Sequence, residues 1–464
     1  MSGLVRVTGS CASRLHSYRR NQRNRVDENR ENYSTKTDIL LVVTTIVPRR
    51  ALATARRRAS FSRVLVVNGP RQSGKSVLLR LLHDELGGSL TSFDDVPYLR
   101  VARNDPAGFL RESARPAFVD EVQRAGNPFI LAVKAAVDQT DRPGQFVLAG
   151  STRFLLEPRL SESLAGRALF VDLWPFSQGE VEQTASEDLP SIAFVGPDAV
   201  RSLDIVGESR HQTFARVCRG GMPLGIALSD RDRREFLLAY ARTLTSRDVT
   251  EMGRIPSSVD LPSVLRALAG RSSGEHNLAE LARTFGTSPE VMARMLRLLE
   301  SVFVHFRLPA WSRNLTAKAV RKPKLHLTDS GLAAALCGVD ASALSRPESP
   351  QSGALLETFV ASEIARQLTW SDTEATMFHW RDRDGAEVDV VLERPSGEIV
   401  GIEVKAAVDV NRSDTAGLRT LRDRLGPKFV TGLLLHCGDR VQWLEDRIVA
   451  LPIAALWTAG ASTS

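Results

Sequence analysis

The sequence predicts an α/β protein with a parallel sheet in its N-terminal half, a helical middle region and a second α/β domain near its C-terminal end. Two patterns favour the parallel sheet: short apolar runs alternate with helical stretches from Val64 onward, and a glycine-rich turn joins the first run to the first helix. After a gap rich in Pro and Ser near residues 345–352, the alternation returns from Leu355 to about Trp457, which indicates the second α/β domain.

Length and composition support this organisation. A chain of 464 residues that is 43% hydrophobic and 25% charged can build two or three domains with apolar cores. The apolar run Ile39–Val47 is too short to cross a bilayer, so we expect a cytoplasmic protein without a membrane segment. A reducing compartment and inert thiols, rather than disulfides or a zinc site, are expected because no CxxC pair occurs among Cys11, Cys218, Cys337 and Cys437.

The positive charge of the chain is concentrated at its N-terminal end. The net charge is +7, but residues 1–63 carry fourteen Lys or Arg against four Asp or Glu, which leaves a net charge of −3 for residues 64–464. Global attraction to DNA or anionic lipid would therefore come from the N-terminal arm, while a local basic groove elsewhere stays open. We expect residues 1–45 to be a disordered basic leader, or residues 1–37 to be upstream sequence from a start codon set too early.

The first domain is expected over residues 46–185. Its predicted strands are Val64–Asn68, Ala117–Asp120 and Phe146–Ala149. Helical stretches lie between or beside them, at Ser76–Leu86 and Pro128–Asp138, so the strands should form parallel βαβ units.

The middle region is expected over residues 186–345 and should be mostly helical. A linker or surface insertion is predicted from Glu180 to about Arg219, because this stretch is interrupted by Pro190, Gly196, Pro197 and Gly207.

A helix-turn-helix pattern follows in this region. Leu278–Phe285, a Gly-Thr turn and Ser288–Glu300 form the two helices, with Ser288 as the N-cap, and Phe303–Phe306 and Lys324–Leu327 are the expected wing strands. Two interpretations stay open: a packing or relay element, or a DNA-reading helix that exposes Arg294 and Arg297 beside an apolar set of Val291, Met295, Leu298 and Leu299.

The turn after the first strand matches the phosphate-binding pattern GxxxxGK[ST] in its required place between a strand and a helix. Glycines let the backbone approach phosphates, and the helix N-terminus directs its amides at them. Lys75 would reach the β and γ oxygens of ATP, and Ser76 would offer its hydroxyl to Mg²⁺. The predicted nucleotide site consists of Gly69, Pro70, Arg71, Gln72, Ser73, Gly74, Lys75 and Ser76.

Four further residues are expected to serve this site. The second strand ends in Asp120 and Glu121, which suit ordering of magnesium-bound water and polarisation of the attacking water. Ser151 follows the third strand, where a sensor of the γ-phosphate would lie. Arg167 could supply positive charge to the transition state in its own chain or in a neighbour, which hints at a homo-oligomer, or be an ordinary surface arginine.

Two runs near the C-terminus alternate polar and apolar residues with period two. If they pair through a turn at Pro395–Glu398, the side chains of Asp389, Glu403 and Lys405 converge, with Glu387 on the same face. Two acids and a lysine are a set that binds a divalent metal for phosphodiester hydrolysis. The alternative is that these charges face water in weak surface pairs.

Glu357 is expected to join this set as a metal ligand. The positions three, four and seven residues after it are apolar, so its carboxylate lies on the apolar face of its helix. A charge in that environment requires a partner or a metal.

These motifs together resemble the bacterial and archaeal AAA-type ATPases that join a P-loop domain to a winged-helix segment and a C-terminal domain of unknown function with a restriction-endonuclease-like, PD-(D/E)XK, core. The resemblance covers about Ile46 to Trp457. Beyond the phosphate loop it rests on Pro48-Arg49-Arg50, Val119-Asp120-Glu121-Val122-Gln123-Arg124, Gly150-Ser151, Leu164-Ala165-Gly166-Arg167, Arg247-Asp248-Val249, Thr328-Asp329-Ser330-Gly331-Leu332 and Gly385-Ala386-Glu387-Val388-Asp389.

The resemblance implies an ATP-dependent switch or motor and a nuclease-like domain over residues 353–460. The nucleotide site is matched by Lys75, Ser76, Asp120 and Glu121, and the nuclease-like motif by Glu357, Asp389, Glu403 and Lys405. Val388 stands where that motif usually has a proline, a departure that does not exclude metal binding. Two hypotheses follow: an ATPase that acts on nucleic acid through its C-terminal acids, or a nucleotide-gated binding module without nuclease activity.

Overall fold

The computed structural model describes residues 47–151, 164–248, 260–275, 277–312 and 322–459. Pro48–Ser464 form one unit by their contacts, and the leader expected over residues 1–45 lies outside the described residues. Within the described ranges, no helix has the length and apolar character needed to cross a membrane.

The N-terminal sheet is fully parallel, as predicted, with the strand order β2-β3-β4-β1-β5. Its strands are β1 (Val64–Asn68), β2 (Ser89–Ser92), β3 (Ala117–Asp120), β4 (Phe146–Gly150) and β5 (Ala168–Asp172). The predicted strands β1, β3 and β4 are the three central ones. The two edge strands, β2 and β5, were not predicted.

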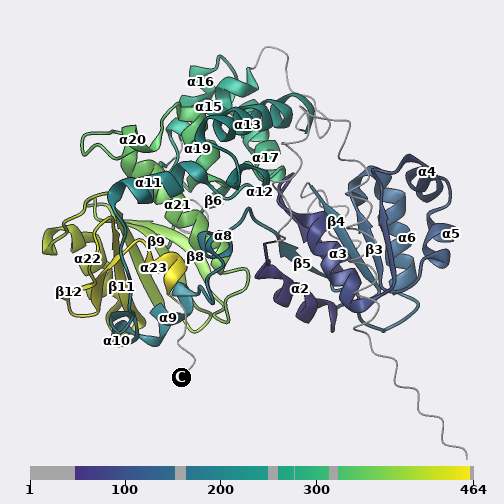
Figure 1. Cartoon of the computed structure of the whole chain (residues 1–464), viewed down its shortest axis with the longest axis horizontal. Helices are drawn as coiled ribbons and strands as arrows, with labels where there is room; N and C mark the ends of the chain where they lie inside the picture. Colours follow the sequence, from purple (N-terminus) through teal and green to yellow (C-terminus); the bar gives the residue numbers. More distant parts are fainter. Residues whose placement is uncertain (1–46, 152–163, 249–259, 276, 313–321, 460–464) are drawn as a thin grey trace, which may run out of the picture. The chain divides into compact units, whose positions relative to one another are not determined.

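Helices cover both faces of this sheet (Figure 1). One face packs on α2 (Ala51–Ala59) and α3 (Lys75–Leu86), and the other on α4 (Val96–Asn104), α5 (Pro106–Glu112) and α6 (Asn127–Val137). A short 3₁₀ helix, η1 (Val122–Ala125), follows β3. Alternate residues of β1 enter the two apolar cores, as strand geometry requires, and all five of its residues are buried.

The stretch expected to be a linker is helical instead. It contains α8 (Gln178–Glu182), α9 (Leu189–Val195), α10 (Pro197–Arg201) and α11 (Arg210–Arg219). Pro190 and Pro197 lie in the first turns of α9 and α10, where a missing amide hydrogen costs nothing. Leu189 and Val200 are fully buried in a large core, so this segment is an integral part of the body.

The remaining middle region is helical, as predicted. Its elements are α12 (Pro223–Ile226), α13 (Asp230–Thr243), a π-helical turn η3 (Leu244–Asp248), α15 (Leu261–Gly270), α16 (Leu278–Thr284), α17 (Pro289–Ser301), α19 (Ser330–Cys337) and α20 (Ala341–Leu344), with the antiparallel strands β6 (His305–Leu308) and β7 (Lys324–Leu327).

The helix-turn-helix elements lie at the expected positions. Ser288 Oγ accepts a hydrogen bond of 3.3 Å from the Val291 amide, which confirms the N-cap of α17. Arg294 and Arg297 are exposed, while Met295 is buried. The winged-helix identity of these elements stays a prediction.

The C-terminal sheet has six strands in the order β12-β13-β11-β10-β9-β8. The strands are β8 (Thr376–Arg381), β9 (Glu387–Glu393), β10 (Ile399–Lys405), β11 (Phe429–His436), β12 (Gln442–Glu445) and β13 (Ile448–Pro452). The helices are α21 (Ser352–Gln367), α22 (Ala416–Leu425), α23 (Ala455–Thr458) and the 3₁₀ turns η4 (Arg412–Thr415) and η5 (Gly426–Lys428). The second α/β unit is therefore present, and its restriction-endonuclease-like identity stays a prediction.

Helices α21 and α22 bury different apolar faces. Side chains of α22 join a small core with β9 and β11, whereas those of α21 belong to a larger core that also includes α9, α11 and α15. One apolar core thus runs from Leu189 to Ala459, across the boundary expected between the middle and C-terminal domains.

Candidate functional site

The phosphate loop begins with a glycine that no other residue can replace without a shift of the backbone. A Cβ on Gly69 would lie 2.3 Å from the Leu173 carbonyl oxygen. Gly74, at the start of α3, has a φ of 95°, in the left-handed region that favours glycine. Strand, loop and helix are therefore arranged as the motif predicts.

Lys75 lies in the centre of this loop and is 5% exposed. Its ammonium group donates to the carbonyl oxygens of Gly69 at 3.0 Å and Pro70 at 2.7 Å. Burial lowers the pKa of Lys75 to about 8, although Glu121 and Asp120 favour its charged form. The loop thus holds a partly desolvated cation at its centre.

The carboxylate of Asp120, at the end of β3, meets the loop although β4 lies between β3 and β1. Ser76 Oγ donates to Asp120 Oδ2 at 2.5 Å, and Asp120 Oδ1 accepts from the Glu121 amide at 2.9 Å. The hydroxyl and carboxylate expected to share a magnesium ion are in direct contact.

Glu121 is held by two neighbours, and one of them was not predicted. Its φ of 51° is left-handed, and its carboxylate accepts from the side-chain amide Nε2 of Gln123 and, at 3.3 Å, from Ser151 Oγ. Gln123 also donates to Ser151 Oγ at 3.0 Å. Ser151 therefore reaches the expected water activator, and Gln123 connects both residues.

Arg167 does not reach the phosphate site of its own chain. It precedes β5, and its carbonyl oxygen accepts from the Val64 amide at the start of β1, the opposite end of that strand from the loop. Its guanidinium pairs with both carboxylate oxygens of Asp138. This position does not fit the expected role of Arg167 in the phosphate site of its own chain. A role toward a neighbouring chain stays a prediction.

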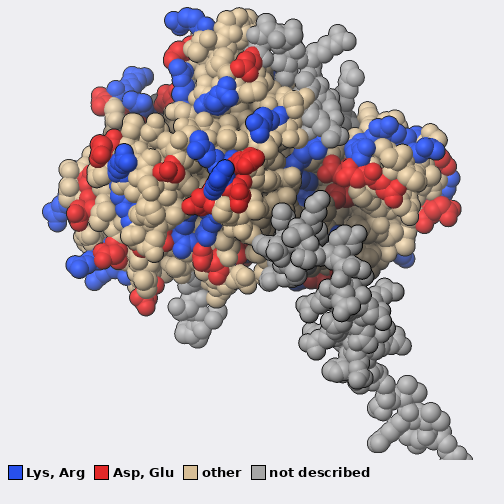
Figure 2. Space-filling view, turned by 45° about the horizontal axis from the view of Figure 1, so that its top comes forward, with Lys and Arg blue, Asp and Glu red and all other residues tan. Residues whose placement is uncertain are grey.

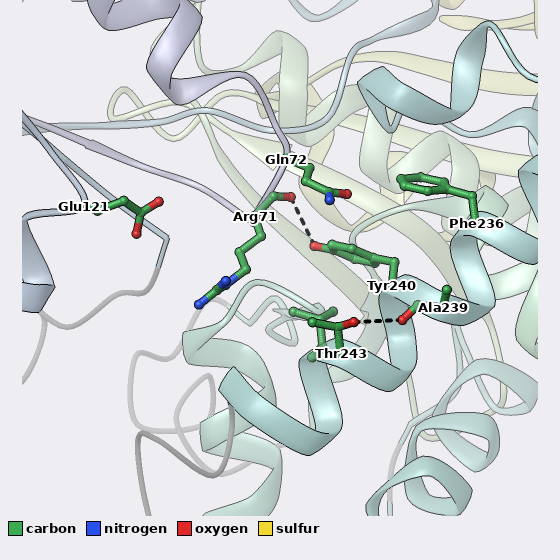
Figure 3. Close-up of a pocket in the computed structure, with 8 residues that line it drawn as sticks. Arg71, Gln72, Glu121, Phe236, Ala239, Tyr240 and Thr243 are labelled. Atoms are coloured by element: carbon green, nitrogen blue, oxygen red, sulfur yellow. Dashed lines mark hydrogen bonds between the residues drawn. The ribbon is translucent and has the colours of Figure 1, made fainter. Parts of the chain in front are cut away.

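A cavity of about 370 Å³ opens beside the loop, between it and α13 (Figure 3). The Tyr240 hydroxyl donates to the Arg71 carbonyl oxygen at 3.3 Å, and the Arg71 side chain points into the cavity. Glu121 and Phe236 also line it. The loop and the middle region therefore share one cavity wall.

Arg49 connects the phosphate loop to α8 from within the protein. Its guanidinium donates to the carbonyl oxygens of Ser73 at 3.1 Å and Trp174 at 2.6 Å, and lies 3.3 Å from Glu180. It also stacks 4.5 Å from the ring centre of Phe176. Burial lowers the pKa of Arg49, opposed by the attraction of Glu180.

The network continues from α8 into the C-terminal part of the chain. Glu180 also accepts from the Ser177 amide at 3.1 Å, and the adjacent Gln178 amide donates to Glu363 of α21 at 2.9 Å. Glu363 pairs with Arg366, and both side chains are at most 1% exposed. Arg366 in turn donates to the Thr328 carbonyl oxygen, just after β7, at 3.1 Å.

At the C-terminal sheet, β9 and β10 form the predicted antiparallel hairpin. The Arg394 amide donates to the Glu398 carbonyl oxygen at 3.0 Å across the turn. Asp389 Oδ2 accepts from the Val404 amide at 3.0 Å, and Lys405 donates to Glu403 Oε1 at 2.7 Å. The Asp389 carboxylate thus contacts the backbone between Glu403 and Lys405, and the predicted site formed by these side chains stays a prediction.

A lysine that was not predicted lies within this cluster. Lys324 of β7 places its ammonium nitrogen 2.8 Å from Glu357, 2.6 Å from Glu387 and 3.2 Å from Asp389. Burial alone would lower the pKa of Lys324, but the three carboxylates raise it above its ordinary value. This cation links the middle region to the C-terminal sheet.

Two acids of the cluster respond in the same direction to this arrangement. Burial, and to a lesser extent repulsion by Asp389, raises the pKa of Glu357 well above its ordinary value, although the attraction of Lys324 opposes this shift. Burial and Asp389 also raise the pKa of Glu403 to about 8, against the attraction of Lys405. Both shifts favour the protonated carboxyl, as expected where acids outnumber the cations that face them.

No group of three or more His, Cys, Asp or Glu side chains is arranged to hold a metal within the described ranges. Around Lys324 the carboxylates instead have the spacing of hydrogen bonds to an ammonium. A metal at Glu357, Asp389 and Glu403 therefore stays a prediction that requires rearrangement.

A second cavity, of about 400 Å³, lies where β8 ends near this cluster. Basic and imidazole side chains predominate among the residues that line it: Glu275, Ala310, Lys322, His379, Arg381, Asp382 and Arg383. Arg381 is the register partner of Glu387. Elsewhere, Figure 2 shows Lys and Arg interspersed with Asp and Glu over the face that it draws.

Local signals for the unpredicted residues were present but incomplete. Glu363 and Arg366, three residues apart on a helix with many apolar residues, indicate a buried ion pair. Lys324 alternates with Leu325 in a buried strand and is 3% exposed, which signals a partner without identifying it.

Comparisons with known proteins agree with the N-terminal site. Residues 61–182 match the family described as AAA domain, so this part of the chain is an AAA-type P-loop ATPase domain. Residues 210–343 match a domain of unknown function (DUF8612), and residues 352–456 match another (DUF4143). Neither description mentions a winged helix or a nuclease.

Relatives extend over most of the chain. Uncharacterized proteins of Mycobacterium tuberculosis and Mycobacterium bovis are each 28% identical over 416 residues, which cover 89% of this chain and 85% of theirs. An uncharacterized protein of Haemophilus influenzae is 22% identical and covers 80% of this chain and 89% of its own.

Solved structures resemble the chain loosely. The Walker-type ATPase of Pyrococcus abyssi is 15% identical with a TM-score of 0.37, over 63% of this chain and 96% of that one. The RuvB Holliday junction branch migration motor of Thermotoga maritima is 20% identical with a TM-score of 0.27, over 56% and 86%. With TM-scores below 0.5, neither likeness carries an argument about function.

Proposed function

We propose that the chain binds ATP with Mg²⁺ at the phosphate loop and hydrolyses it. The observation that carries this proposal is the 2.5 Å contact between Ser76 and Asp120, which joins the loop hydroxyl to the β3 carboxylate. These two groups would hold Mg²⁺, which would neutralise charge on the β and γ phosphates. Match of this segment to the AAA domain family supports the same activity.

The other residues of the site would act around the phosphates. Lys75 would exchange its carbonyl partners for phosphate oxygens, and its charged form would be favoured there. Glu121 would orient and polarise the attacking water, with Ser151 and Gln123 holding its carboxylate in place.

Substitution of the water activator separates binding from hydrolysis. Glu121→Gln should keep ATP binding within about threefold and lower turnover by about 10²-fold or more, because general-base assistance contributes that much. Asp84→Asn, at an exposed position on α3, is the matched control and should leave both unchanged. Hydrolysis by Glu121→Gln at the wild-type rate would remove Glu121 from this role.

We further propose that the nucleotide state controls the C-terminal domain. The buried network from Ser73 through Arg49, Glu180, Glu363 and Arg366 supports it, because a shift of the loop carbonyl would disturb α8 and then α21. Buried charges in such a network cannot separate without a large desolvation cost, so they tend to move together.

The output of that control would be metal-dependent action on nucleic acid at the C-terminal acids. The contact of Asp389 with the backbone between Glu403 and Lys405 supports a divalent metal site, and the adjacent cavity with Lys322 and Arg381 would suit a phosphate backbone.

A nucleotide-gated binding module without nuclease activity is the second candidate. The observation that favours it is Lys324, which gives the acids a cation from the chain itself. Nuclease activity with Mg²⁺ or Mn²⁺ and ATP distinguishes the candidates when wild type is compared with Asp389→Ala and Lys405→Ala. Asp423→Ala, at an exposed position of the same domain, is the control. Activity that survives both site substitutions would exclude these acids.

A further inference from the structure

The ammonium group of Lys324 has three carboxylate partners, whereas a simple ion pair has one. An ammonium group has three donor hydrogens, and Lys324 has three carboxylate partners at 2.6 to 3.2 Å. The partners come from α21 and β9, whereas the lysine comes from β7. It therefore lies in the centre of a set of oxygen ligands, as a bound cation would.

The cluster also contains an acceptor that the lysine does not satisfy. Glu403 is 8% exposed, and its Oε2 is buried without a hydrogen-bond partner among the described residues. Its other oxygen accepts from Lys405 at 2.7 Å. A buried carboxylate oxygen without a partner is costly, so this atom favours an additional cation in the cluster.

Acidic groups outnumber basic groups in the cluster, unlike in the neighbouring pair on α21. Glu363 and Arg366 oppose one acid to one base. Here two ammonium groups face four carboxylates: Lys324 and Lys405 against Glu357, Glu387, Asp389 and Glu403. If all four acids are ionised, the excess is two negative charges, and a divalent cation in place of the Lys324 ammonium would reduce it to one.

The rearrangement that this exchange needs is small. Oxygen ligands lie about 2.0–2.1 Å from Mg²⁺ and somewhat farther from larger divalent ions. Glu357 and Asp389 now lie 2.8 and 3.2 Å from the lysine nitrogen, so each of these two carboxylates would move inward by about 1 Å. Lysine is suited to leave, because its ammonium ends a flexible four-carbon stem.

We propose that Lys324 is an exchangeable internal cation that occupies the divalent-metal position of the C-terminal cluster, so that metal binds only when its ammonium group leaves. This inference rests on the metal site in the proposed function and adds its regulation. The ligands for the metal would be Glu357, Asp389 and Glu403, and Glu387 would lose its partner in the exchange.

The test is Mn²⁺ binding to the full chain without nucleotide, followed by electron paramagnetic resonance. Lys324→Met keeps the length of the stem and removes the charge, so it should bind Mn²⁺ at least tenfold more tightly than wild type. That added site should persist in Lys324→Met with Asp120→Asn, which changes the nucleotide site, and vanish with Asp389→Asn. A folded Lys324→Met protein with no added Mn²⁺ site would overturn both the exchange and the C-terminal metal site.

Equal affinity in wild type and Lys324→Met, abolished by Asp389→Asn, would overturn the exchange and leave the metal site standing. Neither result affects the ATPase proposal, which depends on separate residues.

A second measurement uses the wild-type chain and does not require the variant to fold. Acetylation of Lys324, which is 3% exposed, is compared by mass spectrometry with that of Lys428, an exposed lysine of the same domain. Millimolar Mn²⁺ should raise the acetylation of Lys324 severalfold relative to Lys428. An unchanged ratio would overturn the exchange.

Discussion

Replacing Arg49 with methionine tests whether the buried network holds the phosphate loop to the rest of the protein. The substitution removes the bonds to the Ser73 and Trp174 carbonyl oxygens and the 3.3 Å contact with Glu180. Glu180 keeps the amides of Arg50 and Ser177 as donors, but its side chain is 1% exposed and loses its charged partner.

Removal of one partner from a buried ion pair costs about 3–5 kcal/mol, because the other charge stays desolvated. We therefore expect Arg49→Met to lower the free energy of unfolding by about 3–5 kcal/mol. Arg49→Met with Glu180→Gln should recover part of that loss, with a coupling of about 1–3 kcal/mol.

Urea denaturation followed by circular dichroism measures these differences through the transition of the N-terminal domain. Arg56→Met is the matched control, since Arg56 pairs with Glu85 at the surface, where the side chains are 52% and 38% exposed. That variant should unfold like wild type. Arg49→Met that also unfolds like wild type would refute the proposed network.

Three other substitutions give distinct readouts. ATP affinity, measured by calorimetry, should fall about tenfold per pH unit above pH 8, because the charged form of Lys75 binds phosphate and its pKa is about 8. Binding above pH 8 therefore takes up a proton. The Lys75→Arg variant stays charged, so its ATP affinity should not change with pH over this range. Gly69→Ala should lose ATP binding in a filter assay, since its Cβ would lie 2.3 Å from the Leu173 oxygen; retained affinity would contradict the close approach. Leu356 is fully buried in α21, so Leu356→Ala should lower the free energy of unfolding by about 2–5 kcal/mol. Leu131→Ala, at an exposed position, is the control, and a smaller loss for Leu356→Ala than for this control would be inconsistent with the shared core.

Features set by local sequence were predictable. β1, β3 and β4 are short apolar runs, and the loop between β1 and α3 follows from its own residues. The pairing of β9 with β10 was predictable because a short turn fixes their register.

Features that depend on edges or helix starts were missed. β2, with the sequence Ser-Leu-Thr-Ser, is a half-exposed edge strand and lacks an apolar run. Pro190 and Pro197 suggested a linker, because a proline that opens a helix has the same local signature as one in a loop.

Contacts between distant parts of the chain could not be predicted. Lys324 lies 33 residues from Glu357 and 65 from Asp389 in sequence, and no periodic pattern links them. The same holds for Arg49 and Glu180, which only the fold brings together.

Hydrogen exchange with and without a non-hydrolysable ATP analogue and Mg²⁺ tests the claim that nucleotide state controls the C-terminal cluster. We predict that the analogue changes exchange at the phosphate loop and also at β7 and α21, and that Arg49→Met removes the distant change while the loop still responds. A change confined to the loop and β3 in the wild-type chain would contradict that control.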